Sequence, residues 1–336
     1  MVNQVAHSAI LLVGGFGTRL HPLTNHTPKP MLPVAGIPFT EHQVVKARAA
    51  GITEIVLATS YLAKVFEPYF GNGERFGIEI SYAVEERALG TGGAIAHAAK
   101  QLKKSGPVVI LNGDILSSHD LSAQLEFHSS QAADVTLFLT EVSDARAFGA
   151  VELDGYRILT FNEKMSNPPT NIINAGCYIF NRNIIESIPT GRVVSVERET
   201  FPDLLAVGKS LFGFLDNSYW IDIGTPPSLL KATRDLISGV AHSIAFDELL
   251  ATNRYSRKFG SLIAMDADID PSAIIDSGSL ISPRVQIDAG AKVHGSIIFD
   301  SARIGASSEL SNTFVAPDSD IPPGFIATNQ FFGFSG

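Results

Sequence analysis

The chain has 336 residues, about twice the commonest size of a single domain, so we expect two domains. Hydrophobic residues make up 45% of it and charged residues 18%, a balance that excludes a disordered chain or a coiled coil. The formal net charge of −9 argues against a surface for duplex nucleic acid, because such surfaces usually carry an excess of basic residues.

The cysteine content and the N-terminus indicate the compartment. A single cysteine, Cys177, excludes an intrachain disulfide and a cysteine-rich zinc site, and it favours a reducing environment. The apolar run after His7 ends at Gly14, which is too short for a signal peptide or a membrane span. We therefore expect a soluble, cytoplasmic protein with neither nucleic acid nor membrane as a partner.

From the start to about residue 240, strand-like apolar runs alternate with helix-like stretches, a pattern typical of an α/β sheet covered on both faces. A helix capped by Thr40 should end at Gly51, and one that starts at Thr91 should reach Lys104. A helix over 226–237 should close this domain. The expected strands are 9–13, 55–59, 78–84, 108–111 and 135–140.

A second pattern follows a connecting segment at 241–262. Aliphatic residues recur every six positions from residue 263, with one interval of five, and small residues often stand four positions later. This period fits neither an amphipathic helix nor a hairpin; it favours a parallel β-helix of short stacked strands. We therefore expect a Rossmann-like mixed-sheet domain at 1–240 and a β-helix with its tail at 263–336. The nine aliphatic residues are Ile263, Ile269, Ile275, Ile281, Ile287, Val293, Ile298, Ile304 and Leu310.

The first strand ends in a glycine-rich loop. Its backbone N–H groups can converge on an anion, and Arg19 and Lys29 add positive charge that can meet phosphate oxygens. The loop lacks the last glycine of the dinucleotide fingerprint and the Gly-Lys-Ser/Thr ending of the P-loop. We predict a triphosphate site made by Leu12, Gly14, Gly15, Gly17, Thr18, Arg19 and Lys29.

The segments 14–19 and 28–34 together resemble the signature of the sugar-1-phosphate nucleotidyltransferases almost residue for residue. Among the branches of this family, the chain looks most like the shorter bacterial mannose-1-phosphate guanylyltransferases, which carry a truncated left-handed β-helix. The resemblance implies transfer of GMP from GTP to mannose 1-phosphate, with GDP-mannose and pyrophosphate as products. It also implies that Arg19, Lys29, Asp114 and Asp222 form the catalytic group.

Two acids are candidates for metal binding. Asp114 follows a buried strand, at the edge where open α/β sheets bind ligands, and Asp222 stands among apolar residues just before a helix. The resemblance implies that they hold Mg²⁺ together. The histidines His21, His26, His42, His97, His119 and His128 show no paired metal spacing, and we expect surface or capping positions for them.

The remaining substrate contacts follow from the same resemblance. Its sugar-phosphate pocket corresponds to Asp114, Gly149, Glu163, Lys164, Asn174 and Gly176. Its base-reading segment corresponds to Glu86, Gly90 and Thr91. A carboxylate only accepts hydrogen bonds, so Glu86 would favour guanine over uracil or thymine, while cytosine and a solvated role for either Glu85 or Glu86 stay open.

Two alternatives remain at this point. The same chemistry could use heptose 1-phosphate, glucose 1-phosphate or another nucleotide, and the chain could be a non-catalytic regulatory subunit of the same fold. A regulatory subunit tends to lose charged residues of the site, whereas this chain has all five, which favours an enzyme. They are Arg19, Lys29, Asp114, Lys164 and Asp222. The repeat region is too short for an acyl-CoA site. We expect it to serve assembly of a homo-oligomer, most simply a dimer.

Overall fold

The computed structural model describes residues 7–15, 17–59 and 63–334. The chain divides into two compact units, each made of two separate stretches of sequence. The first unit comprises Met1–Gly15 and Gln43–Trp220, and the second comprises Phe16–His42 and Ile221–Gly336. The chain therefore crosses between the units in the glycine-rich loop, within helix α1 (Phe39–Ala49) and within strand β13 (Trp220–Asp222).

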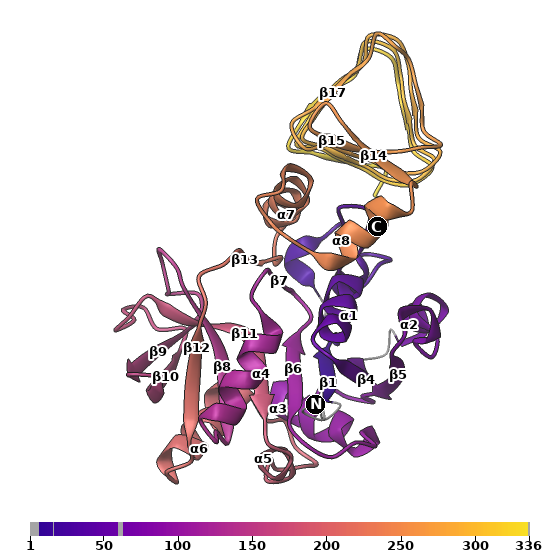
Figure 1. The fold of residues 1–336 in the computed structure, drawn as a ribbon. Coiled ribbons are helices and arrows are strands. Elements are labelled where there is room, and N and C mark those ends of the chain that lie inside the picture. The colour runs from indigo at the N-terminus through magenta and orange to yellow at the C-terminus, as the bar shows by residue number, and fades with distance from the viewer. Residues whose placement is uncertain (1–6, 16, 60–62, 335–336) are drawn as a thin grey trace. The chain divides into compact units, whose positions relative to one another are not determined.

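The first unit contains a nine-stranded mixed sheet (Figure 1). Its strands are β1 (His7–Leu12), β4 (Ile52–Thr59), β5 (Glu79–Val84), β6 (Val108–Asn112), β8 (Val135–Glu141), β9 (Gly149–Asp154), β10 (Arg157–Glu163), β11 (Ile172–Phe180) and β12 (Leu211–Leu215). Strands β5, β4, β1 and β6 are parallel, and β11 pairs antiparallel with both β6 and β8. The predicted mixed α/β sheet is confirmed.

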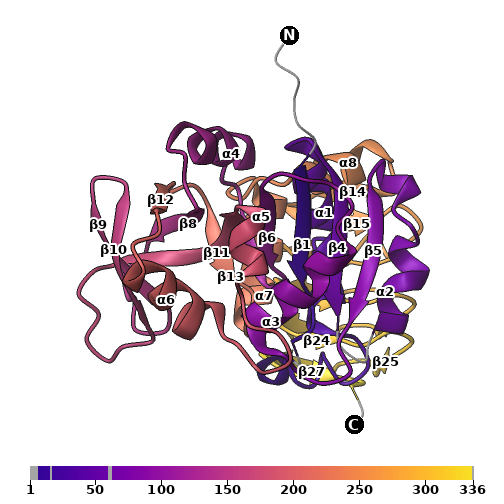
Figure 2. The same ribbon diagram turned by 90° about the horizontal axis from the view of Figure 1, so that it is seen from below.

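Helices cover both faces of this sheet, with α4 on one face and α3 and α6 on the other (Figure 2). The helices of the first unit are α2 (Ala63–Phe70), α3 (Gly90–Ala98), α4 (Leu121–Ser130), α5 (Arg182–Glu186) and α6 (Phe201–Ala206). Ile95 of α3, Ile185 of α5 and Phe201 of α6 pack into one core cluster with alternate strand residues such as Leu137. Its short elements are η3 (Glu74–Phe76), η4 (Ala99–Gln101), the π-helix η5 (Val196–Thr200) and strand β7 (Ile115–Ser117).

Three local predictions differ from the structure. Helix α1 already begins at Phe39, so Thr40 lies inside it, and the Thr40 hydroxyl donates to the Pro30 carbonyl instead of capping the helix. Helix α3 ends at Ala98, well before Lys104, and continues only as the short η4. The strand–helix alternation weakens after residue 135, because β8 to β11 return along the sheet as antiparallel neighbours.

The second unit joins the segment after the glycine-rich loop to the C-terminal part of the chain. Helix α7 begins with a capping box, in which the side chains of Thr225 and Ser228 each accept a hydrogen bond from the other's backbone N–H. The elements before the β-helix are η1 (Thr18–Leu20), η2 (Lys29–Met31), β2 (Pro33–Val34), β3 (Ile37–Pro38), α7 (Pro226–Ser238), α8 (Ile244–Ala251) and β14 (Tyr255–Lys258).

The C-terminal strands stack in three parallel sheets that form the sides of a triangle (Figure 1). The predicted left-handed β-helix of hexapeptide repeats is confirmed: eight of the nine aliphatic residues are core residues of one cluster, and Ile269 packs against it partly buried. The strands are β15 (Ser261–Ala264), β16 (Asp268–Ile269), β17 (Ile274–Asp276), β18 (Leu280–Ile281), β19 (Gln286–Ile287), β20 (Lys292–His294), β21 (Ile297–Ile298), β22 (Arg303–Ile304), β23 (Glu309–Ser311), β24 (Phe314–Val315), β25 (Asp320–Ile321), β26 (Ile326–Thr328) and β27 (Phe331–Phe332).

The interval of five residues in the repeat lies at one corner of the triangle. Equivalent corner residues Ser261 and Ser279 are 18 positions apart, whereas Ser279, Ser296 and Thr313 follow at intervals of 17. The side chain of Arg234, on α7, packs against this corner and donates to the Gly295 carbonyl at 2.8 Å. From Ser279 onward, each coil is therefore one residue shorter at this corner, where the arginine side chain packs.

The positions of three histidines contradict the sequence prediction. His42, His119 and His128 are each only 3% exposed, so they are core residues with hydrogen-bonded rings. Each buried ring is hydrogen-bonded to a protein group instead of water, and the spacing of histidines in the sequence does not reveal these partners. Among the described residues, no helix is both long and apolar enough to cross a membrane.

Candidate active site

The end of β1 and the start of η1 contain the predicted triphosphate loop. Leu12 is the last residue of β1, and Gly14 and Gly15 follow it in the first unit. Apart from Gly15 itself and its two chain neighbours, no heavy atom of the described residues lies within 4 Å of the place where a Gly15 Cβ would be, which leaves room beside this backbone. Phe16, the third residue of the motif at 14–19, lies outside the described residues.

Gly17 opens the second-unit part of this loop. Its φ of +62° is a left-handed conformation that favours glycine, and a Cβ there would lie 2.8 Å from the Cβ of Lys29. Thr18 and Arg19, both exposed, begin η1 directly after it. The glycine therefore lets the backbone turn closely past Lys29.

The second unit brings together three of the predicted catalytic residues. The ammonium of Lys29 lies 3.8 Å from Oδ1 of Asp222, and their side chains are 10% and 26% exposed. A Cβ added at Gly224 would lie 2.8 Å from Nη2 of Arg19 and 3.0 Å from Oδ1 of Asp222, so both groups border this glycine. Two cations and one carboxylate thus lie around Gly224. The excess of positive charge favours binding of a further anion there.

The turn after β6 holds the other predicted metal ligand. Asp114 is half-buried at the carboxyl end of β6, as predicted for an acid at the ligand-binding edge of the sheet. The N–H of Gly113 donates to the Leu12 carbonyl at 3.0 Å, and a Cβ at Gly113 would lie only 2.4 Å from that oxygen. This contact holds the turn against the end of β1 within the first unit.

Glu163 and Lys164 end strand β10 beside Gly149. Glu163 pairs with Gly149 in the sheet, and a Cβ at Gly149 would lie 2.9 Å from the Glu163 carboxylate. The ammonium of Lys164 is 3.3 Å from Oε1 of Glu163, and Lys164 is exposed with a φ of +53°. The two side chains are therefore neighbours, with the lysine on the solvent side.

Asn174 and Gly176 lie at an irregularity in β11. The register shifts between Asn174 and Tyr178, and the Asn174 side chain accepts from the Gly176 N–H at 3.1 Å and donates to the Tyr178 hydroxyl at 2.8 Å. Gly176 has a φ of +79°, and a Cβ there would lie 3.0 Å from the Asn112 side chain. The predicted sugar segment therefore contacts the turn that carries Asp114.

The predicted base-reading segment places its two glutamates differently. Glu85 is half-buried, accepts from the Leu89 N–H at 3.3 Å and has a pKa raised by burial. Glu86 is exposed, so its carboxylate is available to a ligand. Gly90, with a φ of +73°, packs against the Val194 carbonyl and begins α3, one residue earlier than expected.

Sequence reasoning missed Glu197, which lies in the π-helix η5. Its carboxylate accepts from the Thr91 hydroxyl at 2.7 Å and from the Ser195 hydroxyl at 3.0 Å, and the Tyr178 hydroxyl lies 3.5 Å away. It therefore joins the predicted base segment to the strand that carries Asn174. The only signal in the sequence was Ser195 followed closely by acids, a pattern typical of a helix start.

The described residues contain no group of three or more histidine, cysteine, aspartate or glutamate side chains arranged to hold a metal ion. Asp114 lies in the first unit and Asp222 in the second. Each is half-buried and offers carboxylate oxygens, the donors that Mg²⁺ prefers. A cation that keeps most of its water and phosphate ligands needs few such protein donors.

Comparisons with known proteins bear on this site. Residues 8–239 match a family model described as nucleotidyl transferase, and residues 246–329 match one described as GlmU-like, C-terminal hexapeptide. A mannose-1-phosphate guanylyltransferase from Mycobacterium tuberculosis is 46% identical over 300 residues, which cover 89% of this chain and 81% of that protein.

Two further similarities concern the first part of the chain. A D-glycero-alpha-D-manno-heptose 1-phosphate guanylyltransferase from Aneurinibacillus thermoaerophilus is 38% identical over 68% of this chain and 97% of its own length. The crystal structure of HddC from Yersinia pseudotuberculosis complexed with GMP-PN has a TM-score of 0.57 at 30% identity, covering 67% of this chain and 97% of that one. The resemblance drawn from the glycine-rich loop is confirmed, and the chain belongs to the nucleotidyl transferase family with a C-terminal hexapeptide-repeat region.

Proposed function

We propose that the protein is a mannose-1-phosphate guanylyltransferase, which transfers GMP from GTP to mannose 1-phosphate. The observation that carries this proposal is the grouping of Arg19, Lys29 and Asp222 around Gly224, in a chain 46% identical to an enzyme of that name. A phosphate oxygen of the sugar attacks the α-phosphorus of GTP, the bond from that phosphorus to the bridging oxygen breaks, and pyrophosphate leaves.

The residues of the chain act by alignment and charge. The attacking oxygen is already ionised at neutral pH, so neither a strong base nor a covalent intermediate is required. Arg19 and Lys29 stabilise the negative charge on the departing pyrophosphate, and the backbone around Gly14, Gly15 and Gly17 surrounds the triphosphate. Because Lys29 has low exposure, its electrostatic interaction with phosphate is stronger than that of a solvated lysine.

We infer that Asp114 and Asp222 hold Mg²⁺. Their carboxylate oxygens suit this hard cation, and the position of Lys29 beside Asp222 suits a phosphate that contacts both the lysine and the ion. When bound, the ion would neutralise charge on the α-phosphate. Asp114 is held in place by the contact of its turn with β1.

The sugar and base contacts are part of the same proposal. Lys164 binds the phosphate of the sugar, Glu163 accepts bonds from sugar hydroxyls, and Asn174 with the backbone of Gly176 fixes the others. Glu86 accepts from the N1–H and amino group of guanine. The exposure of Lys164 and Glu86 supports these roles, because both side chains can reach a ligand.

A heptose 1-phosphate is the second candidate substrate. The heptose-specific relative is 38% identical over 97% of its own length, although it corresponds only to the first 68% of this chain. A regulatory subunit without activity is disfavoured, because the charged residues of the site are all present.

The experiment that decides between these substrates is a matrix of nucleoside triphosphates against sugar 1-phosphates, with pyrophosphate release as the readout. We expect the highest kcat/KM with GTP and mannose 1-phosphate. A higher value with the heptose phosphate or with another nucleotide would replace the proposed substrate, and no release with any pair would favour the regulatory subunit.

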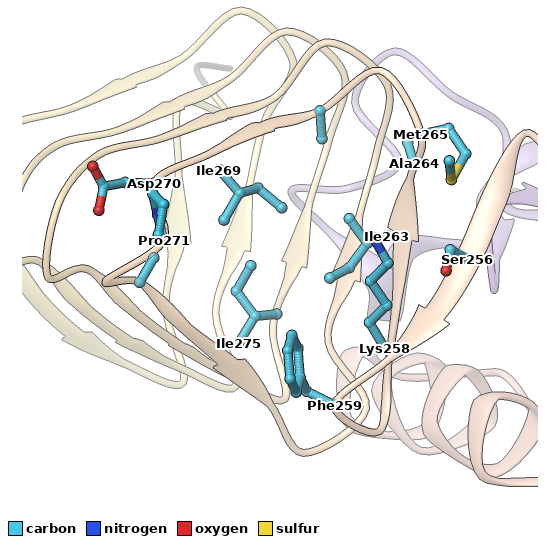
Figure 3. Close-up of a pocket in the computed structure, with 12 residues that line it drawn as sticks. Ser256, Lys258, Phe259, Ile263, Ala264, Met265, Ile269, Asp270, Pro271 and Ile275 are labelled. Carbon is cyan, nitrogen blue, oxygen red and sulfur yellow. The ribbon is translucent and has the colours of Figure 1, made fainter.

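We also propose that the β-helix serves assembly of a homodimer. The first coil has an open end with a cavity of about 380 Å³, into which Ile263, Ile269 and Ile275 point (Figure 3). Phe259 and Met265 at this end are 81% and 60% exposed, an apolar surface that a second copy would cover. On this proposal, residues 1–240 carry catalysis, 241–262 connect, and 263–336 serve association.

Light scattering tests the assembly proposal. The full chain should be dimeric, and Phe259→Asp with Met265→Asp should lower its association state without changing kcat. A monomeric parent chain, or a double variant that stays dimeric, would contradict it.

We also propose that the enzyme works in the cytoplasm. Cys177 is free and buried, and a single cysteine fits a reducing compartment.

A further inference from the structure

Two polar side chains of α1 reach the turn that carries Asp114. Gln43 and Lys46 are three residues apart, so they lie on the same side of the helix. The Gln43 amide donates to the Asn112 carbonyl at 3.4 Å and also to the Ile115 carbonyl. The Lys46 ammonium donates to the carbonyl and hydroxyl oxygens of Ser117, at 2.9 and 3.1 Å. The acceptor carbonyls therefore stand on both sides of Asp114.

The third donor position of Lys46 is also occupied. Its ammonium lies 2.8 Å from Nδ1 of His119, and Nε2 of the same ring lies 3.2 Å from the Gln124 side-chain oxygen. Nδ1 therefore accepts from the lysine while Nε2 carries the proton. The His119 ring is 3% exposed and stacks on Phe138, with ring centroids 3.8 Å apart. This packing holds the lysine head group at a fixed place.

Stability does not explain why Gln43, Lys46 and His119 are polar. Burial lowers the pKa of Lys46 to about 8, which records the cost of keeping a charge there. Apolar side chains of similar volume can often replace buried polar groups without loss of stability. Fixing the direction of backbone groups is a task that apolar side chains cannot perform.

We propose that Gln43 and Lys46 are positioning residues that orient the Asp114 carboxylate toward its divalent cation. The inference rests on the proposed function of Asp114. With the carbonyls of Asn112, Ile115 and Ser117 fixed by side chains of α1, the intervening turn has little freedom to rotate. Binding of the ion then costs little conformational entropy of this turn, because the carboxylate is already oriented.

The test measures Mn²⁺ binding by electron paramagnetic resonance, with GTP present and the sugar phosphate absent. Gln43→Met and Lys46→Met should each raise the Mn²⁺ dissociation constant about tenfold, and Lys46→Arg should restore much of the affinity because it keeps the donors. Lys100→Met, at an exposed lysine of η4, is the matched control and should change nothing. The melting temperature reports whether each variant is folded.

Two results would overturn the inference or its basis, and they are distinguishable. A Mn²⁺ dissociation constant within about twofold of the parent value in folded Gln43→Met and Lys46→Met would reduce both residues to a structural role. If Lys46→Met does not fold, Gln43→Met alone decides, because it removes a neutral group. If Asp114→Asn binds Mn²⁺ as the parent does, the metal role in the proposed function is wrong, whatever the α1 variants do.

Discussion

The ammonium of Lys29 lies 3.8 Å from Oδ1 of Asp222, and both side chains are largely shielded from solvent. On the proposed function, the carboxylate contributes charge to a metal ion and the neighbouring lysine contributes charge to phosphate. Asp222→Asn removes one charge at constant size, so we expect turnover at saturating Mg²⁺ to fall at least about a hundredfold. Pyrophosphate release measures this.

The control for Asp222→Asn is Asp154→Asn, at an exposed carboxylate that ends β9. Both variants should melt close to the parent temperature. Turnover of Asp222→Asn within a few-fold of the parent would contradict the metal role.

The two lysines of the site should act on different substrates. Lys164→Ala removes a charge-assisted contact, so we expect the KM for the sugar phosphate to rise roughly tenfold to a hundredfold with little change for GTP. Lys29→Ala should show the reverse pattern. Steady-state kinetics with each substrate varied in turn checks the division, and equal effects of both variants on one substrate would disprove it.

Glu86→Gln should relax base selection. The amide adds donors that the carbonyls of uracil and thymine can use, so the ratio of kcat/KM for GTP to that for UTP should fall about tenfold. Glu85→Gln serves as the comparison, because the Glu85 carboxylate already accepts from the Leu89 N–H. An unchanged ratio in Glu86→Gln together with a reduced one in Glu85→Gln would transfer the role to Glu85.

Gly17→Ala tests the close approach of the loop to Lys29. The substitution combines a left-handed backbone with a Cβ contact of 2.8 Å, so we expect a loss of stability above about 1 kcal/mol and a higher KM for GTP. Gly155→Ala is a matched control, since Gly155 has a φ of +56° and open space around its Cβ. Denaturant unfolding of both variants separates the backbone cost from the contact, and equal losses would argue against the contact.

The buried ring of His42 makes stability depend on pH. Burial lowers the pKa of His42 to about 4, against a hydrogen bond to the Val34 carbonyl that acts in the opposite direction. Between pH 6.5 and 4 the unfolded chain binds more protons than the folded one, so stability is lost as the pH falls through this window. The loss from this one group between pH 7 and 4.5 should be about 2 kcal/mol.

Denaturant titrations of the parent and of His42→Gln at the two pH values measure this contribution. The variant should lose less stability on acidification, because a glutamine does not titrate. The pKa of His119 is also lowered by burial, so the parent loses more in total, and the difference between the two proteins isolates His42. An identical pH dependence would show that His42 is not the responsible group.

The sequence predicted the β-helix well because its information is local. Each inward residue of a coil stands five or six positions from the next, and the residue one coil later, as with Ile281 and Ile298, lies beside it. The glycine-rich loop was predictable for a similar reason, since Gly17 and Lys29 lie close together in the chain.

The polar network of the first unit could not be predicted in this way. Thr91 meets Glu197 across 106 positions, and Lys46 meets His119 across 73. No periodicity in a single sequence connects residues so far apart. The prediction for the histidines failed for a related reason, because the ring of His128 is bonded to Asn181, which lies 53 positions away at the start of α5.

The coil length of the β-helix restricts how the C-terminal part of the chain can change in size. Since Ser279, Ser296 and Thr313 occupy the same corner at intervals of 17 residues, deletion of residues 296–312 would join Gly295 to Thr313 with every inward position kept. Deletion of a single residue would instead turn the next aliphatic side chains outward until a corner absorbed the shift. The length of this tail is therefore quantised: viable shortening or extension proceeds by whole coils.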